Sequence, residues 1–88
     1  MITVEPIGAD RFRVVVEGAA TTTHTVTVSA DYCTKLTGGR SSAEVLIERS
    51  FEFLLQRESN TSILRRFDLP VIGEYFPEYE RIIKHRLS

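Results

Sequence analysis

The residues able to do metal or nucleophilic chemistry are few and lie far apart in the sequence. Zinc and iron sites need several thiolates or imidazoles at workable spacing, and the candidates here are Cys33, His24 and His85. Cys33 and His24 could be written as a nucleophile and its base, but a buried thiol and a histidine at the edge of the core explain the same residues. We therefore expect no metal centre, no cofactor and no catalytic constellation, and we predict that the chain is not an enzyme.

Two further polar patterns have ordinary structural explanations. The segment 38–42, Gly-Gly-Arg-Ser-Ser, could hold an anion on free amide groups ahead of a helix, but a helix C-cap followed by an N-cap explains the same residues. Glu44, Glu48 and Glu52 fall on one exposed face of a predicted helix, where Arg49 partly balances them. Neither pattern predicts a site.

One segment near the C-terminus is unusual in composition. SILRRFDLPVIGEYFPEYE, residues 62–80, contains four of the chain's eight aromatic residues. Aromatic and arginine side chains dominate the hot spots of protein interfaces. We therefore predict that this segment forms a surface for a protein partner, with the contacts made by Arg65, Arg66, Phe67, Tyr75 and Tyr79.

Closure of the core by the same aromatic residues is the alternative interpretation of this segment. The two interpretations differ at the arginines, Arg65 and Arg66. Arginines that bind a partner should make no ion pairs within the monomer. Arginines with a structural role should instead pair with nearby carboxylates, for which the candidates are Glu58, Asp68 and Glu74.

Composition and charge limit the class of protein. With 88 residues, of which 42% are hydrophobic and 26% charged, the chain fits one small globular domain, residues 1–88. A net charge of -1 leaves no global field that would collect nucleic acid or anionic lipid. Cys33 has no second cysteine to pair with, and the N-terminus resembles neither a signal peptide nor a membrane span. We expect a cytoplasmic protein without membrane contact, and the small core also fits a homodimer.

The first 29 residues have the period-2 alternation of β-strands. Residues 2–6, 11–17 and 23–29 predict a three-stranded antiparallel meander, in which the valines of the second and third strands face the core. His24 shares the valine face of the third strand. The threonines at 23, 25 and 27 fall on the opposite, solvated face.

The rest of the chain predicts helices. Residues 30–58 should form two, since Ser29 and Ser42 stand at N-cap positions and Gly38 at a C-cap. In the aromatic-rich segment 59–88 we expect a helical turn around 63–67, another over 70–76 and a last helix from Pro77. The predicted fold is thus α+β, an N-terminal three-stranded antiparallel meander followed by three to five helical segments packed on one face.

Two stretches resemble a group of small, uncharacterised bacterial proteins. They are FEFLLQRESNTSILRRFDLPVIGEYFPEYE, residues 51–80, and ITVEPIGADRFRVVVEG, residues 2–18. The resemblance covers nearly the whole chain and implies a bacterial cytoplasmic protein, but it implies no activity, cofactor or site.

The stretch THTVTVSADYCTKLTGGRSSAEVLIERSFEFLL, residues 23–55, is similar to ribbon-helix-helix DNA-binding proteins, in which strands paired across a dimer enter the major groove. This likeness implies a dimeric transcriptional regulator or antitoxin. Its base-reading and phosphate-contacting residues would be Thr23, Thr25, Thr27, Arg40, Ser41 and Ser42. An intramolecular meander explains the same threonines as β-formers on a solvated face. Our function prediction is therefore a non-enzymatic protein-interaction module with an unidentified protein partner, and DNA binding is the alternative.

Overall fold

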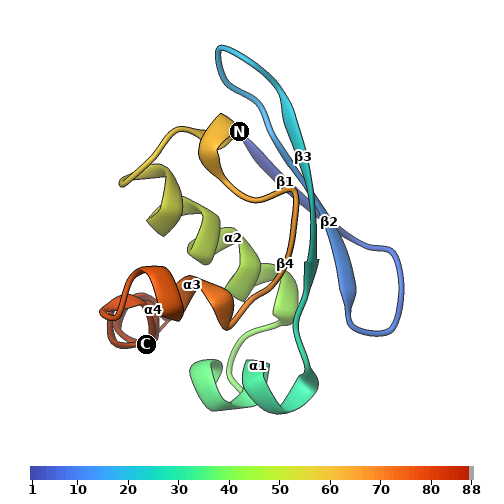
Figure 1. Cartoon of the computed structure of the whole chain (residues 1–88). Coiled ribbons are helices and arrows are strands. Elements are labelled where there is room, and N and C mark those ends of the chain that lie inside the picture. Colours follow the sequence, from blue (N-terminus) through green and yellow to red (C-terminus); the bar gives the residue numbers. More distant parts are fainter. Residues whose placement is uncertain (88) are drawn as a thin grey trace.

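The computed structural model describes residues 1–87, so Ser88, the last residue of the predicted domain, lies outside the described residues. The strands are β1 (Ile2–Pro6), β2 (Arg11–Val16), β3 (Thr22–Thr27) and β4 (Arg66–Asp68) (Figure 1). The α-helices are α1 (Ala30–Thr37), α2 (Ala43–Leu55), α3 (Val71–Tyr75) and α4 (Tyr79–Leu87), and a 3-10 turn, η1, covers Asn60–Ser62. The α+β class is confirmed.

The four strands form one mixed sheet in the order β1-β2-β3-β4. β1, β2 and β3 form the antiparallel meander that the alternation predicts, with Val14 opposite His24. β4 then runs parallel to β3, with Phe67 opposite Val26. The sheet is therefore not purely antiparallel as predicted. A parallel neighbour needs a long crossover, and α1 and α2 supply it.

The prediction of a helical turn around residues 63–67 is wrong. The chain makes its 3-10 turn earlier, at η1, and then extends into β4. Backbone hydrogen bonds to the open edge of β3 explain the difference: Thr25 N–H donates to the carbonyl of Arg65 at 2.7 Å, and Leu69 N–H donates to the carbonyl of Thr27 at 2.8 Å. The remaining helical predictions are confirmed, because α3 and α4 follow Pro70 and Pro77.

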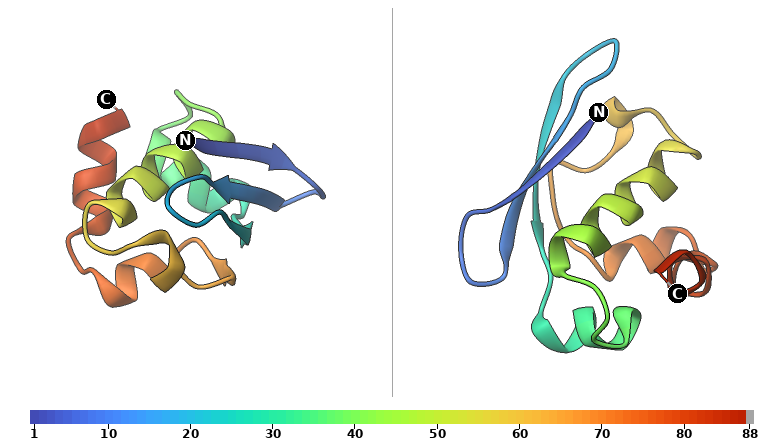
Figure 2. Two further views of the ribbon diagram at one scale, coloured as in Figure 1. Left: turned by 90° about the horizontal axis from the view of Figure 1, so that it is seen from above. Right: turned by 180° about the vertical axis from the view of Figure 1, so that it is seen from behind.

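The helices pack on one face of the sheet, with α2 lying across it and α4 farther out (Figure 2). Phe51 of α2 is fully buried toward the sheet, where its ring lies 5.3 Å from that of His24 and 6.1 Å from that of Phe67. Phe53 of the same helix points to α4, with its ring 5.3 Å from that of Tyr79. α2 therefore joins the sheet to the C-terminal helix, as the width of its apolar face indicates.

Candidate functional site

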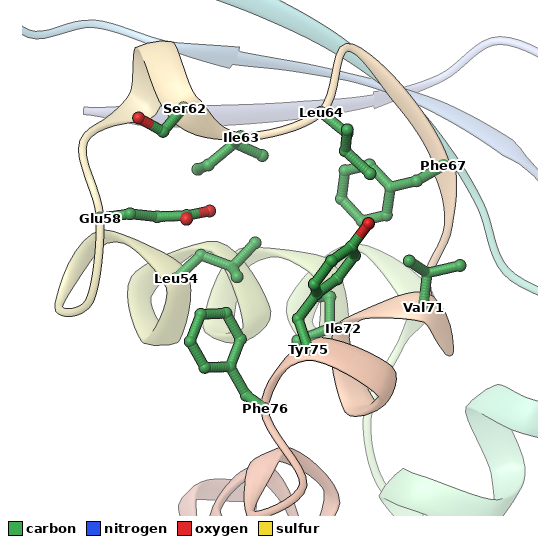
Figure 3. Close-up of a pocket in the computed structure, with 10 residues that line it drawn as sticks. All are labelled: Leu54, Glu58, Ser62, Ile63, Leu64, Phe67, Val71, Ile72, Tyr75 and Phe76. Atoms are coloured by element: carbon green, nitrogen blue, oxygen red, sulfur yellow. The ribbon is translucent and has the colours of Figure 1, made fainter.

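A cavity of about 300 Å³ opens beside β4 (Figure 3). It lies between the end of α2, the segment that leads into β4, and α3. Its buried apolar lining consists of Leu54, Ile63, Phe67 and Ile72. The rest of the lining is formed by Glu58, Ser62, Leu64, Val71, Tyr75 and Phe76.

Two large side chains at the rim of this cavity are exposed. Leu64 is 47% exposed and Tyr75 is 67% exposed. Within residues 1–87, the only other large hydrophobic side chains with such exposure are Met1 and Ile7, near the N-terminus. Exposed apolar groups gathered around a hollow are typical of interaction sites.

Arg65 and Arg66 lie at the same edge of the molecule, and both are exposed. Neither makes an ion pair or a side-chain hydrogen bond with any residue that the structure describes, whereas Arg57 lies 3.5 Å from the Glu78 carboxylate. Asp68 is also without an ionic partner among residues 1–87. Structural arginines would pair here with Glu58, Asp68 or Glu74, and these pairs are not formed.

A buried hydrogen-bond chain positions this edge. His24 Nδ1 donates to the carbonyl of Leu64 at 2.7 Å, and its Nε2 lies 2.9 Å from the hydroxyl of Thr22. Asn60 Nδ2 in turn donates to the Thr22 hydroxyl at 2.9 Å and to the carbonyl of Ala20 at 2.8 Å. The segment 60–64 is thereby fixed to β3 just before β4 begins. Sequence reasoning missed this role of Asn60, whose partners lie about 40 positions earlier in the chain.

An arginine just after the end of α2 is stacked on an aromatic ring near the cavity. The Arg57 guanidinium lies 3.6 Å from the centre of the Phe53 ring and 6.0 Å from that of Phe76. Phe76 lines the cavity and meets Phe53 edge to face at 5.8 Å. Phe76, the ring that bounds this side of the cavity, thus packs against Phe53, which the Arg57 cation–π contact holds in turn.

The structure separates the five predicted partner-surface residues. Tyr75 is exposed at the rim of the cavity, and Phe67, only 8% exposed, lines it; Arg65 and Arg66 are exposed on the segment between the lining residues Leu64 and Phe67. Tyr79 is different, because it is fully buried between α4 and α2 and its hydroxyl lies 2.6 Å from the Ser50 hydroxyl. Its place on the predicted surface is corrected: Tyr79 is a core residue.

The strand of the ribbon-helix-helix likeness pairs with strands of its own chain. Thr23, Thr25 and Thr27 lie on the outer face of the sheet, but β3 is hydrogen-bonded to β2 on one side and to β4 on the other. Along Thr25–Thr27 both edges of β3 are occupied, so this part of the strand cannot pair with its copy in a second molecule. Ser42 caps α2 by accepting the N–H of Val45 at 3.2 Å; Ser41 is half-buried and Arg40 exposed in the same turn.

The residues considered for metal and nucleophilic chemistry do not meet. Across residues 1–87, no three His, Cys, Asp or Glu side chains are grouped so that they could hold a metal ion. Cys33 is half-buried in α1, while both ring nitrogens of His24 are engaged in hydrogen bonds.

Among the described residues 1–87, no helix combines the length and apolar character needed to cross a membrane. Compared with models of protein families, with curated proteins and with solved structures, the chain matches none of them.

Proposed function

We propose that this chain is a non-enzymatic protein-interaction module. Its docking surface consists of the cavity together with Leu64, Arg65, Arg66 and Tyr75, and is called the β4 surface below. One observation carries the proposal: two exposed apolar side chains border an apolar cavity, and the segment that lines it carries two exposed arginines that have no ionic partner in residues 1–87.

The chemistry of the β4 surface fits a protein better than a small molecule. Its cavity of about 300 Å³ stands at the lower limit of ordinary ligand pockets. The exposed side chains of Leu64 and Tyr75 extend the apolar area beyond the cavity. An apolar centre with arginine at its margin is the composition of a protein interface.

Site-specific photo-crosslinking tests the proposal in the organism that encodes the chain. The photoreactive residue p-benzoylphenylalanine is placed at position 75, and in a matched control at position 23, which is exposed on the outer face of the sheet. We expect covalent protein adducts from position 75, at least about tenfold fewer from position 23, and a comparable loss when Arg65→Glu and Arg66→Glu are combined with the position-75 probe. No adduct from position 75, or equal adducts from both positions, would refute the function.

A further inference from the structure

β4 has a free edge beside the cavity. It is the last strand of the sheet, and Phe67 and the two flanking residues, Arg65 and Leu69, direct their backbone groups toward β3. Because backbone groups alternate in direction along a strand, the N–H and C=O groups of Arg66 and Asp68 point away from the sheet. An added strand would meet four backbone groups ready to pair.

The sequence of β4 is self-complementary in charge. When two copies of Arg66-Phe67-Asp68 pair antiparallel about Phe67, each Arg66 faces Asp68 of the second copy. In this register the outward groups of Arg66 and Asp68 form the hydrogen-bonded pairs, and Phe67 falls at the non-hydrogen-bonded position, where side chains approach more closely. Arg66 and Asp68 have no ionic partner in residues 1–87, so both are available for this contact.

Other registers are unfavourable. Pairing centred on Arg66 would place the two Arg66 side chains opposite each other, and pairing centred on Asp68 would do the same with two carboxylates. A shift by a single residue would turn the inner side chains of one copy to the outer face. The register centred on Phe67 is the one that places opposite charges across from each other and keeps the inner side chains of both copies on the same face of the sheet.

The second edge of the sheet is less suited to pairing. β1 ends at Pro6, which has no N–H to donate, and its Glu5 already pairs with Arg13. At β4, antiparallel pairing places a two-fold axis perpendicular to the sheet, so the helices of both copies stay on one side. Leu64 and Tyr75, exposed in the monomer, would then flank the junction in both copies.

We propose that the partner at the β4 surface is a second copy of this chain. The two copies join through antiparallel β4 pairing centred on Phe67, so that two four-stranded sheets become one continuous sheet. This inference rests on the proposed function, because it names the partner of the same surface.

Charge reversal and its rescue test the pairing. Sedimentation equilibrium is measured for the wild type, Arg66→Asp, Asp68→Arg and the double variant that exchanges the two charges. We expect a wild-type dimer, at least about a tenfold larger dimer dissociation constant for each single variant, and recovery to within about threefold of the wild-type constant in the double variant. Thermal unfolding should stay unchanged at a concentration where all the proteins are monomeric, since both side chains are exposed and unpaired.

Arg11→Asp is the matched control, because it reverses an exposed arginine on the same outer face that also has no ionic partner in residues 1–87 but lies two strands away, and it should leave the dimer intact. A wild type that is still monomeric at a protein concentration of about 100 µM would overturn the inference. This value is the upper range of dissociation constants for a specific weak dimer. A dimer whose dissociation constant is unchanged by both single charge reversals would also overturn the inference. The proposed function fails separately: crosslinks from position 75 to a different protein, with a monomeric wild type, would support an interaction module and refute the second copy as its partner.

Discussion

His24 connects the β4 surface to the centre of the sheet through a single side chain. Its ring packs 5.3 Å from that of Phe51, while its Nδ1 donates to the carbonyl of Leu64 and its Nε2 contacts the hydroxyl of Thr22. The side chain is fully buried, so water cannot replace these hydrogen bonds. One residue thus fills part of the core and satisfies one buried polar group, the Thr22 hydroxyl, and one part-buried group, the Leu64 carbonyl.

His24→Phe separates these two roles. The aromatic ring is kept, but the carbonyl of Leu64 and the hydroxyl of Thr22 lose their ring partner. A buried polar group left unsatisfied costs about 1–3 kcal/mol, so we expect the free energy of unfolding to fall by about 2–3 kcal/mol, measured by urea denaturation followed by circular dichroism. Thr23→Val, on the exposed face of the same strand, is the control and should change it by less than about 0.5 kcal/mol. A His24→Phe variant as stable as the control would contradict the role of the ring nitrogens.

At the scale of elements, the sequence predicts those structures whose signals are local. Alternation of the valines is enough to predict the meander, and Ser29 and Ser42 accept the N–H groups of Tyr32 and Val45 as predicted N-caps. β4 lacks such a signal, because three residues are too few to show a period. Its pairing depends on an open edge of β3 some 40 residues earlier.

The candidate site divides in the same way. The density of arginine and aromatic residues predicts a surface around residues 65–75, and the structure exposes Arg65, Arg66 and Tyr75 there. Tyr79 could not be assigned from its helix alone, because the apolar face of α4 contacts a helix that lies more than 20 residues away. The cavity itself arises from three separate segments, so no local pattern could predict it.

Two glycines in helical regions should respond oppositely to the same substitution. Gly38 ends α1 with φ 65° while its N–H donates to the carbonyl of Thr34 at 2.8 Å. Gly73 lies inside α3 without a positive φ, and a methyl group there would meet nothing within 4 Å. We expect Gly38→Ala to lower the free energy of unfolding by about 1–2 kcal/mol and Gly73→Ala to raise it by about 0.5–1 kcal/mol. Urea denaturation measures both, and a change of the same sign in the two variants would contradict these backbone assignments.

At the scale of the whole molecule, polar contacts hold the C-terminal helix against the rest of the helical layer. The hydroxyl of Tyr32 in α1 donates to the Glu80 carboxylate at 2.8 Å, and Lys35 lies 3.5 Å from the same group. On the other side of α4, the hydroxyls of Tyr79 and Ser50 join it to α2 at 2.6 Å. α1, α2 and α4 are therefore linked through two tyrosine hydroxyls, in addition to their apolar packing.

These two tyrosines should make the stability of the whole fold sensitive to alkaline pH. Burial raises the pKa of Tyr79 above its ordinary value, and nearby Glu80 adds to the effect, against an opposing hydrogen bond from Ser50. Burial, followed by the hydrogen bond to Glu80, likewise raises the pKa of Tyr32. In the unfolded chain both phenols ionise near the ordinary value of about 10. Above that pH the unfolded state binds fewer protons than the folded state, so the free energy of unfolding must decrease as the pH rises.

The predicted pH dependence can be traced to particular side chains by urea denaturation at several pH values between 8 and 11, a range chosen to bracket the ordinary tyrosine pKa of about 10. For the wild type we expect little tyrosine-linked change below about pH 9 and a progressive loss of stability above about pH 10. The double variant Tyr32→Phe and Tyr79→Phe should show a clearly shallower decline, whereas Tyr75→Phe, altered at an exposed position, should decline as the wild type does. If the double variant loses stability as steeply as the wild type, the proton linkage lies elsewhere. A shallower decline would instead show that Tyr32 and Tyr79 stay protonated in the folded domain and thereby link its stability to alkaline pH.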